Sequence, residues 1–384
     1  MNCEHFGICG SCTLNLPYSE QILHKKEQIR SLFSEFYNGE FEFFSSPEQN
    51  YRSRAEFGLY HDGDELNFAM NSLDKEKVII KNCHIVEPKI ANLMNEILPK
   101  IKENRNLKNK IFGIEFVASK HDLMAILLYH KDIFEIKNDL ENLANLLKIK
   151  LIARSRGKKL VFGGENLCDE FEIKGKIYRY TYEATAFSQP NRSVNEKMIS
   201  WAKSCVRDGR DFLEMYCGHG NFTIPLSENF KSVLATEISK NSIKNALKNC
   251  EINGVKNIKF VRISSQDLID AFNKVREFRR LAEQNINLSD YNFSHILVDP
   301  PRMGLDSKVC EFIKNYENII YISCNPLTLK ENLKSLCDTH KIAKFAIFDQ
   351  FAHTEHIECG VLLERIKNDR RNFKKCQKHR CRWT

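Results

Sequence analysis

Residues 212–221 read Phe-Leu-Glu-Met-Tyr-Cys-Gly-His-Gly-Asn, an apolar strand that runs directly into a glycine-containing loop. A helical segment, 222–229, follows this loop. Gly218 and Gly220 let the backbone approach a ligand closely where a side chain would collide. The next apolar strand is followed by Glu237, and a carboxylate in that place suits hydrogen bonding to a ribose diol. The stretch therefore indicates an α/β domain with a nucleoside site.

The same alternation of short apolar strands and helices continues through the C-terminal half of the chain. Five strands are predicted there, at 211–215, 232–236, 258–262, 295–298 and 319–322. Strands separated by helices form parallel sheets, so we predict an α/β fold with a doubly wound, mostly parallel, Rossmann-like sheet. Two further strand candidates, 344–349 and 359–364, lie too close together for a crossover helix, and we expect an antiparallel edge pair.

The glycine loop differs from the fingerprint of dinucleotide-binding proteins. It lacks the third glycine of Gly-x-Gly-x-x-Gly, which disfavours NAD. S-adenosylmethionine fits better because it has no pyrophosphate that the loop would have to hold. The glycines alone would also suit a tight turn in any α/β domain. Glu237 and Asp299 each end a predicted strand, however, and together they favour a nucleoside site over a simple turn.

Cys324 stands in Tyr-Ile-Ser-Cys-Asn-Pro (321–326), at the carboxyl end of the fifth predicted strand. Asp299-Pro-Pro-Arg302 ends the strand before it, so both segments are expected at one edge of the sheet. The C5 carbon of a pyrimidine is a poor nucleophile, but a thiolate that adds to C6 turns C5 into a carbanion. Cys324 is therefore the candidate nucleophile for a methyl transfer. The alternative is a small buried thiol that only packs.

A methyl transfer of this kind also needs a base that removes the C5 proton. Glu358, in His-Thr-Glu-His-Ile-Glu-Cys-Gly (353–360), lies just before the last predicted strand and is the first candidate. Glu355, His353 and His356 come from the same segment and compete with it. The alternative reading of this segment is a charged surface loop.

The N-terminal half alternates predicted hairpins with predicted helices. Ile22, Ile29, Phe33 and Phe36 recur at near-helical spacing and predict an amphipathic helix over about 17–36. Two hairpins are predicted, the first with a turn at Asp62-Gly63. The hairpins lie at 51–70 and 111–129, and the helices at 88–103 and 134–147. A strand-rich stretch follows at 151–182. This pattern indicates a compact α+β module.

Changes in pattern along the chain predict four parts. They are a Cys-rich segment and helix at 1–45, an α+β domain at 46–185, a methyltransferase domain at 186–366 and a basic tail at 367–384. The tail either binds phosphates or is a solvated, disordered extension.

Composition and charge narrow the class of protein. The chain has 384 residues, 42% hydrophobic and 28% charged, which is an ordinary globular composition. We find no signal peptide and no apolar run near the roughly 18 residues of a membrane span, so we expect a cytoplasmic protein. A net charge of +8 favours a polyanionic partner, although lysine-rich surfaces are common for other reasons. We predict a monomer without a protein partner.

Taken together, the motifs resemble those of the RNA 5-methyluridine methyltransferases, and within them the tRNA (uracil-5-)-methyltransferase family. The resemblance rests on Asp299-Pro-Pro-Arg302, on 321–326 and on Asp349-Gln-Phe…His-Ile-Glu358-Cys-Gly. Segments 51–57 and 61–64 extend it towards the N-terminus. Asp349-Gln-Phe and the segment 275–281 point to the tRNA branch.

The resemblance implies a reaction and a set of site residues. Cys324 would add to C6 of the T-loop uridine (uridine-54) of tRNA, and Glu358 would take the C5 proton, giving 5-methyluridine. Arg302 would touch the target base, which would be flipped out of its loop while the N-terminal half grips the RNA. The expected S-adenosylmethionine contacts, with the loop glycine included, are Gln189, Tyr216, Gly218, Asn221, Glu237 and Asp299.

The N-terminal cysteines depart from what we expect of many tRNA-branch members. Cys3-x5-Cys9-x2-Cys12, with Cys83 farther on, resembles the [4Fe–4S] ligand pattern of related ribosomal-RNA uracil-5 enzymes. We predict a structural cluster; a relic site or a zinc site is the alternative. Cys376-x4-Cys381 in the tail is a much weaker metal pattern.

Two other functions stay open at this point. The first is the same methylation on 23S ribosomal RNA, which the N-terminal cysteines favour and Asp349-Gln-Phe opposes. The second is a non-catalytic RNA-folding protein that keeps the methyltransferase fold. Intact Cys324 and Glu358 argue against that second reading as a sole role.

Overall fold

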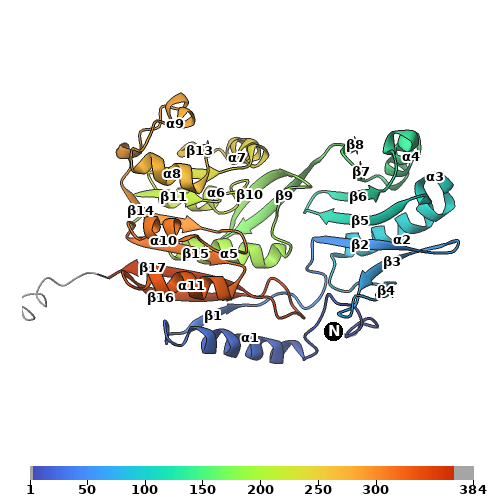
Figure 1. Cartoon of the computed structure of the whole chain (residues 1–384), viewed down its shortest axis with the longest axis horizontal. Coiled ribbons are helices and arrows are strands. Elements are labelled where there is room, and N and C mark those ends of the chain that lie inside the picture. Colours follow the sequence, from blue (N-terminus) through green and yellow to red (C-terminus); the bar gives the residue numbers. More distant parts are fainter. Residues whose placement is uncertain (1–2, 367–384) are drawn as a thin grey trace, which may run out of the picture.

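The computed structural model describes residues 3–366 and divides them between two large β-sheets and a two-stranded hairpin (Figure 1). The predicted basic tail, 367–384, and the weak metal pattern Cys376–Cys381 lie outside the described residues. Within 3–366 no helix has the length and apolar character needed to cross a membrane.

The C-terminal half forms an eight-stranded sheet in the order β1-β16-β17-β15-β14-β11-β12-β13. Its strands are β1 (Phe41–Phe44), β11 (Asp211–Met215), β12 (Ser232–Glu237), β13 (Ile258–Arg262), β14 (Phe293–Val298), β15 (Asn318–Ser323), β16 (His340–Phe348) and β17 (Glu358–Arg365). β11 to β15 pair in parallel, as the alternating pattern predicts. The predicted doubly wound α/β fold is confirmed.

The two last strands differ from the expected edge pair in their place in the sheet. β16 and β17 are antiparallel, as predicted, but β17 lies inside the sheet between β15 and β16. The outer edge of β16 is covered by β1, which pairs with it in parallel. A strand from the N-terminal segment thus removes a sheet edge that would otherwise be exposed.

Helices cover both faces of this sheet and create two apolar cores. Because side chains alternate along a strand, Phe212 packs into one core while Leu213 packs into the other. The helices of this half are α5 (Arg192–Ser204), α6 (Thr223–Leu226), α7 (Lys240–Asn253), α8 (Ser265–Phe272), α9 (Arg279–Glu283), α10 (Ser307–Ile313) and α11 (Pro326–Leu336). Two 3-10 helices, η2 (Ser227–Asn229) and η3 (Leu288–Asp290), complete the connections.

The N-terminal half forms a seven-stranded sheet in the order β4-β3-β2-β5-β6-β7-β8. Its strands are β2 (Arg54–Asp62), β3 (Glu65–Asn71), β4 (Lys77–Ile79), β5 (Ile111–Ala118), β6 (Leu123–Tyr129), β7 (Lys150–Ser155) and β8 (Lys158–Phe162). Its helices are α2 (Pro88–Glu103), α3 (Arg105–Lys108), η1 (Ile133–Ile136) and α4 (Lys137–Leu147). The two predicted hairpins are confirmed. The first turn is Gly63-Asp64, one residue later than expected, because Asp62 pairs with Glu65.

The predicted strand-rich stretch 151–182 is shared between two parts of the structure. Its first strands, β7 and β8, belong to the seven-stranded sheet. Its last two, β9 (Asn166–Ile173) and β10 (Lys176–Glu183), form a separate hairpin whose Phe171 and Tyr180 join the core over α5. The domain boundaries drawn from the sequence stay predictions, although this hairpin and β1 both pack with the C-terminal sheet.

The predicted amphipathic helix is α1 (Tyr18–Phe33), which lies along the eight-stranded sheet below β1 and β16 in Figure 1. Ile29 and Phe33 are buried, as expected. The same buried stripe continues towards the N-terminus with two polar residues, Gln21 and Lys25, instead of with Ile22.

Candidate active site

Cys324 directly follows β15, and Glu358 is the first residue of β17, the strand beside it. β15 and β17 are antiparallel, with Ser323 opposite Cys359. The next step of this register brings Cys324 opposite Glu358. Both residues line one pocket of about 780 Å³. The predicted nucleophile and the predicted base therefore share one wall of a cavity.

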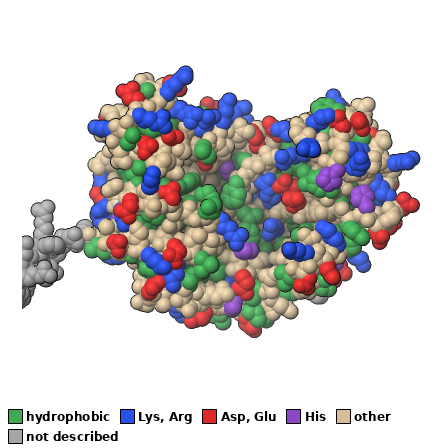
Figure 2. Space-filling model, viewed as in Figure 1, with side chains coloured by type: hydrophobic (Ala, Val, Ile, Leu, Met, Phe, Trp, Pro, Cys, Tyr) green, Lys and Arg blue, Asp and Glu red, His purple; other side chains and the backbone are tan. Residues whose placement is uncertain are grey.

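The pocket lies between the two halves of the molecule. Arg302 lines it from the eight-stranded sheet, and Arg54 and Glu115 line it from β2 and β5. Gln189 and Phe187, which is 73% exposed, contribute the segment before α5. Figure 2 shows the hollow between the two halves, with apolar and basic side chains around it. The cavity is thus wide, open and partly basic, as a site for a nucleotide of an RNA chain requires.

Burial changes the acidity of the two carboxyl groups at this edge of the sheet. Burial, with a smaller contribution from Asp299, raises the pKa of Glu358 to about 8. Burial also raises the pKa of Asp299 to about 7. A carboxyl group with a pKa near 8 is mostly protonated at neutral pH. A positively charged ligand would favour its ionised form.

The pKa of the Cys324 thiol depends on burial and on the charged groups around it. It is half-buried, and burial is the main cause that raises its pKa; Glu358 and Asp299 raise it further. Arg302 acts in the opposite direction. Arg302, Cys324 and Glu358 line the same pocket, and the thiolate becomes more accessible when positive charge enters it.

The other acid–base candidates of the 353–360 segment have different surroundings. Glu355 accepts hydrogen bonds from His24 and Gln28 on α1. His353 is buried and bonded to Gln21. His356 lines the pocket, and burial, then Arg302, lowers the pKa of its imidazole. Glu358 is the candidate that the sheet register brings beside Cys324.

The predicted cofactor residues gather at the carboxyl ends of β11 and β12. Tyr216 and Gly218 both have positive φ angles, 64° and 54°. A Cβ on Gly218 would meet no atom within 4 Å, so the space above this backbone is open to a ligand. The Gly218 amide donates to Glu237 Oε2 at 3.1 Å. The other Glu237 oxygen accepts hydrogen bonds from the Ile238 and Ser239 amides, so the carboxylate is fixed beside the loop. Asp299 follows β14, which pairs with β11.

Two predicted cofactor contacts make internal hydrogen bonds instead. The Asn221 side chain exchanges two amide bonds with Asn195, at 2.9 and 3.0 Å. Gln189 accepts a hydrogen bond from the Gln350 side chain at 3.2 Å and lines the pocket that contains Cys324. Their roles in binding the cofactor stay predictions.

Sequence reasoning assigned no role to Arg54, which orders the mouth of the pocket. Its guanidinium pairs with Glu115 at 2.6 Å and donates to the carbonyl groups of Ala184 and Ala186. This fixes the segment that leads to Phe187 and Gln189. The only sequence signal was its place in 51–57, because a strand arginine gives no indication of a partner more than a hundred residues away.

The N-terminal cysteines come together as well. Cys3, Cys9, Cys12 and Cys83 line one cavity of about 60 Å³. Burial raises the pKa of the Cys12 thiol to about 12, with further contributions from Cys83, Cys9 and Cys3. Within residues 3–366 no group of three or more His, Cys, Asp or Glu side chains is arranged so that it could hold a metal ion. The cavity shares Arg52, Ala55 and Glu56 with the larger pocket.

Comparison with known proteins gives consistent results for sequence and structure. The profile of the family described as tRNA (Uracil-5-)-methyltransferase matches residues 17–366. The tRNA/tmRNA (uracil-C(5))-methyltransferase of Campylobacter concisus is 55% identical over 366 residues, which cover 95% of this chain and 99% of the relative. The protein of the same name from Sulfurovum sp. is 46% identical over 95% of this chain and 100% of the relative.

Among solved structures, the tRNA (uracil-54, C5)-methyltransferase of Pyrococcus abyssi in complex with S-adenosyl-L-homocysteine has a TM-score of 0.71. The two sequences are 21% identical, and the matched region covers 93% of this chain and 86% of the Pyrococcus abyssi chain. At this identity the likeness concerns the fold, and it agrees with a Rossmann-like methyltransferase.

Proposed function

The chain belongs to the tRNA (uracil-5-)-methyltransferase family, and we propose that it methylates C5 of the T-loop uridine, uridine-54, of tRNA. As a member of this family it is an S-adenosylmethionine-dependent methyltransferase, and its product is 5-methyluridine. The observation that supports the proposed chemistry best is the register of β15 and β17, which brings Cys324 beside Glu358 in one pocket.

We propose Cys324 as the nucleophile. Its thiolate forms a bond to C6 of the uracil, and the electron pair of the C5–C6 double bond makes C5 a carbanion. S-adenosylmethionine supplies the electrophilic methyl group. Arg302, which favours the thiolate, would also contact the uracil and stabilise negative charge on it.

Glu358 is proposed as the base that completes the reaction. Its carboxylate takes the C5 proton, the C5–C6 double bond forms again, and the bond to Cys324 breaks with return of the thiolate. A carboxyl group with a pKa near 8 is a stronger base than an ordinary one once it is ionised. Bound positive charge would supply the ionised form at neutral pH.

We propose that the cofactor binds across the carboxyl ends of β11, β12 and β14. Glu237 would bond the ribose hydroxyl groups, and Gly218 leaves room for the nucleoside. Tyr216, Asn221, Gln189 and Asp299 would complete the contacts. The carboxylate of Asp299 has the charge that a sulfonium group attracts.

The substrate and the two reaction groups can be tested together. The assay combines purified enzyme with labelled S-adenosylmethionine and an unmodified tRNA transcript. A second reaction uses the same transcript with uridine-54 replaced by cytidine. A tmRNA transcript is included because the relatives are named for both RNAs. Label in the first tRNA and its absence in the second are expected. Unmodified 23S ribosomal RNA is tested in parallel, and methylation of that RNA without methylation of the tRNA would contradict the proposed substrate.

The mechanism predicts opposite behaviour of two variants. Cys324→Ala should abolish both methyl transfer and any covalent enzyme–RNA adduct, while binding of S-adenosylhomocysteine stays within about twofold. Glu358→Gln should accumulate the methylated adduct, which migrates slowly on a denaturing gel. Turnover by Cys324→Ala would remove it as the nucleophile, and a Glu358→Gln enzyme without adduct would move the base role elsewhere.

We further propose that Cys3, Cys9, Cys12 and Cys83 hold a [4Fe–4S] cluster. In such a cluster each cysteine binds a different iron, so the thiols are spread more widely than around one ion. The observation that supports this proposal is that all four thiols line one cavity. The cluster would fix the loop whose Gly10 and Ser11 line the catalytic pocket. Anaerobically purified protein should contain iron and absorb visible light; colourless, iron-free protein would refute the cluster.

A cytoplasmic location, a monomeric state and phosphate binding by the tail 367–384 remain predictions of the sequence. Size-exclusion chromatography with light scattering would test the monomer. Removal of residues 367–384 should weaken RNA binding mainly at low salt if the tail binds phosphates.

A further inference from the structure

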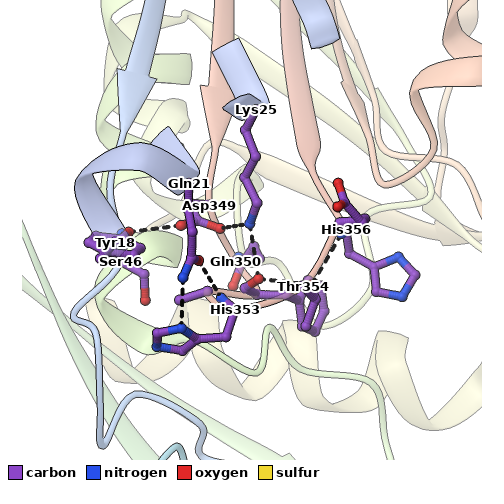
Figure 3. A network of polar contacts seen from close by, with 12 residues as sticks. Tyr18, Gln21, Lys25, Ser46, Asp349, Gln350, His353, Thr354 and His356 are labelled. Carbon is purple, nitrogen blue, oxygen red and sulfur yellow. Dashed lines mark hydrogen bonds and ion pairs between the residues drawn. The ribbon is translucent and has the colours of Figure 1, made fainter. Parts of the chain in front are cut away.

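The segment 349–357 connects β16 to Glu358 and contributes Phe351, Thr354 and His356 to the wall of the catalytic pocket. Figure 3 shows this segment under the N-terminal part of α1, joined to it by a network of polar contacts. The position of Glu358 therefore depends on how this segment is held.

The centre of the network is an ion pair without access to solvent. Lys25 Nζ lies 2.6 Å from Asp349 Oδ1, and both side chains are 0% exposed. The Lys25 ammonium also donates to the Phe351 carbonyl at 3.1 Å. The second Asp349 oxygen accepts a hydrogen bond from the Tyr18 hydroxyl at 2.8 Å. One lysine of α1 thus holds the segment at two points.

A second contact between α1 and the segment uses Gln21 and His353. The Gln21 side chain accepts from the His353 amide at 2.8 Å and bonds His353 Nδ1 at 2.9 Å. His353 Nε2 faces the Glu48 carbonyl at 2.8 Å, so it donates, and Nδ1 must accept from Gln21. His353 has a φ of 65°, a conformation that a residue with a side chain adopts only when its surroundings fix it.

Three successive carbonyl groups of the segment are bonded by N-terminal residues. Lys25 bonds the Phe351 carbonyl, and the Tyr51 hydroxyl bonds the Ala352 carbonyl at 2.9 Å. The amides of Thr13 and Leu14 both bond the His353 carbonyl at 2.9 Å. The path of the backbone is therefore set from outside the methyltransferase sheet.

We propose that Lys25 is a positioning residue for the methyl transfer, which holds segment 349–357 so that Glu358 is aimed at the C5 proton. This proposal rests on the proposed role of Glu358. A buried ion pair adds little to stability compared with apolar residues of the same volume, but its bonds are directional. Such a pair is suited to fixing the path of a backbone, which an apolar contact would leave free to slide.

The decisive measurement is the turnover of the folded enzyme. Lys25→Met removes the ammonium and leaves the apolar stem, and Lys26→Met removes a neighbouring charge of the same helix that lies over Phe43. Lys25→Met should lower kcat about tenfold or more, because small displacements of a catalytic group have effects of up to about a hundredfold. S-adenosylhomocysteine binding should change less than about twofold, and the methylated enzyme–RNA adduct should accumulate. Lys26→Met should behave as the parent enzyme.

The double variant Lys25→Met/Asp349→Asn separates positioning from stability. It contains no buried unpaired charge, so it should recover much of the thermal stability that Lys25→Met loses, and it remains testable if the single variant does not fold. Its kcat should stay low, because the bond to the Phe351 carbonyl is still missing. A double variant that recovers kcat with stability, or a single variant with unchanged kcat, would overturn the proposal.

The outcomes also distinguish this proposal from the proposed function. If Cys324→Ala still turned over, the catalytic scheme would be wrong whatever Lys25 does. If Cys324→Ala is inactive and Lys25→Met matches Lys26→Met in turnover and adduct, only the positioning role fails.

Discussion

Replacing Glu358 by glutamine is expected to stabilise the fold, by an amount that grows with pH. The Glu358 side chain is buried, with 5% of its surface exposed. Burial raises its pKa from 4.5 to about 8 in the folded protein. Between these values the folded state holds a proton that the unfolded chain releases, so the free energy of unfolding falls as pH rises.

The size of the effect follows from the two pKa values. Their difference corresponds to about 5 kcal/mol once the pH exceeds both values, at about 1.4 kcal/mol for each tenfold change in proton affinity. By the same linkage, the buried carboxyl group lowers the free energy of unfolding by about 1 kcal/mol at pH 5.5 and by about 4 kcal/mol at pH 8. Glutamine has no proton to lose, so the variant escapes this penalty.

Urea unfolding of the parent protein and of Glu358→Gln, without cofactor or RNA, measures the difference. The advantage of the variant should increase by about 3 kcal/mol between pH 5.5 and pH 8. Glu355→Gln, a change at a surface carboxylate of the same segment, is the matched control and should show no such trend. An advantage of Glu358→Gln that does not change with pH would refute the reasoning that Glu358 is protonated in the empty site.

Three further predictions concern the pocket, the cofactor loop and α1. In steady-state assays kcat/KM should rise with pH towards about 8, because Glu358 and Cys324 both act in their deprotonated forms and both have a raised pKa. A value of kcat/KM that falls over this range would contradict the assignment. Gly218→Ala should bind S-adenosylhomocysteine at least tenfold more weakly in calorimetry, since a Cβ at a φ of 54° strains the loop backbone and enters the open space above it. Phe33→Ala should lower the free energy of unfolding by about 3–5 kcal/mol in urea titrations, because Phe33 is 0% exposed in the core under β16.

The sequence was sufficient for the architecture of the C-terminal half and for naming Cys324 and Glu358 as candidate reaction groups, whose roles stay predictions. Apolar strands alternating with helices specify a parallel sheet, and the ends of its strands specify where Asp299 and Cys324 must lie. Only the paired strands, however, put Glu358 opposite Cys324. Register across a sheet is a relation between distant segments, so a pattern within one segment does not contain it.

The sequence could not identify the residues that hold the pocket in shape. Lys25 and Gln21 look like surface residues of an amphipathic helix, and only their spacing of four and eight from Ile29 places them on its buried stripe. Arg54 and β1 likewise find partners on segments far along the chain. Local chemistry thus determined the strands, the cofactor loop and the candidate groups of this protein. Tertiary structure alone decided which polar groups lost their water and paired, because desolvation depends on everything that packs around a group and not on its neighbours in sequence.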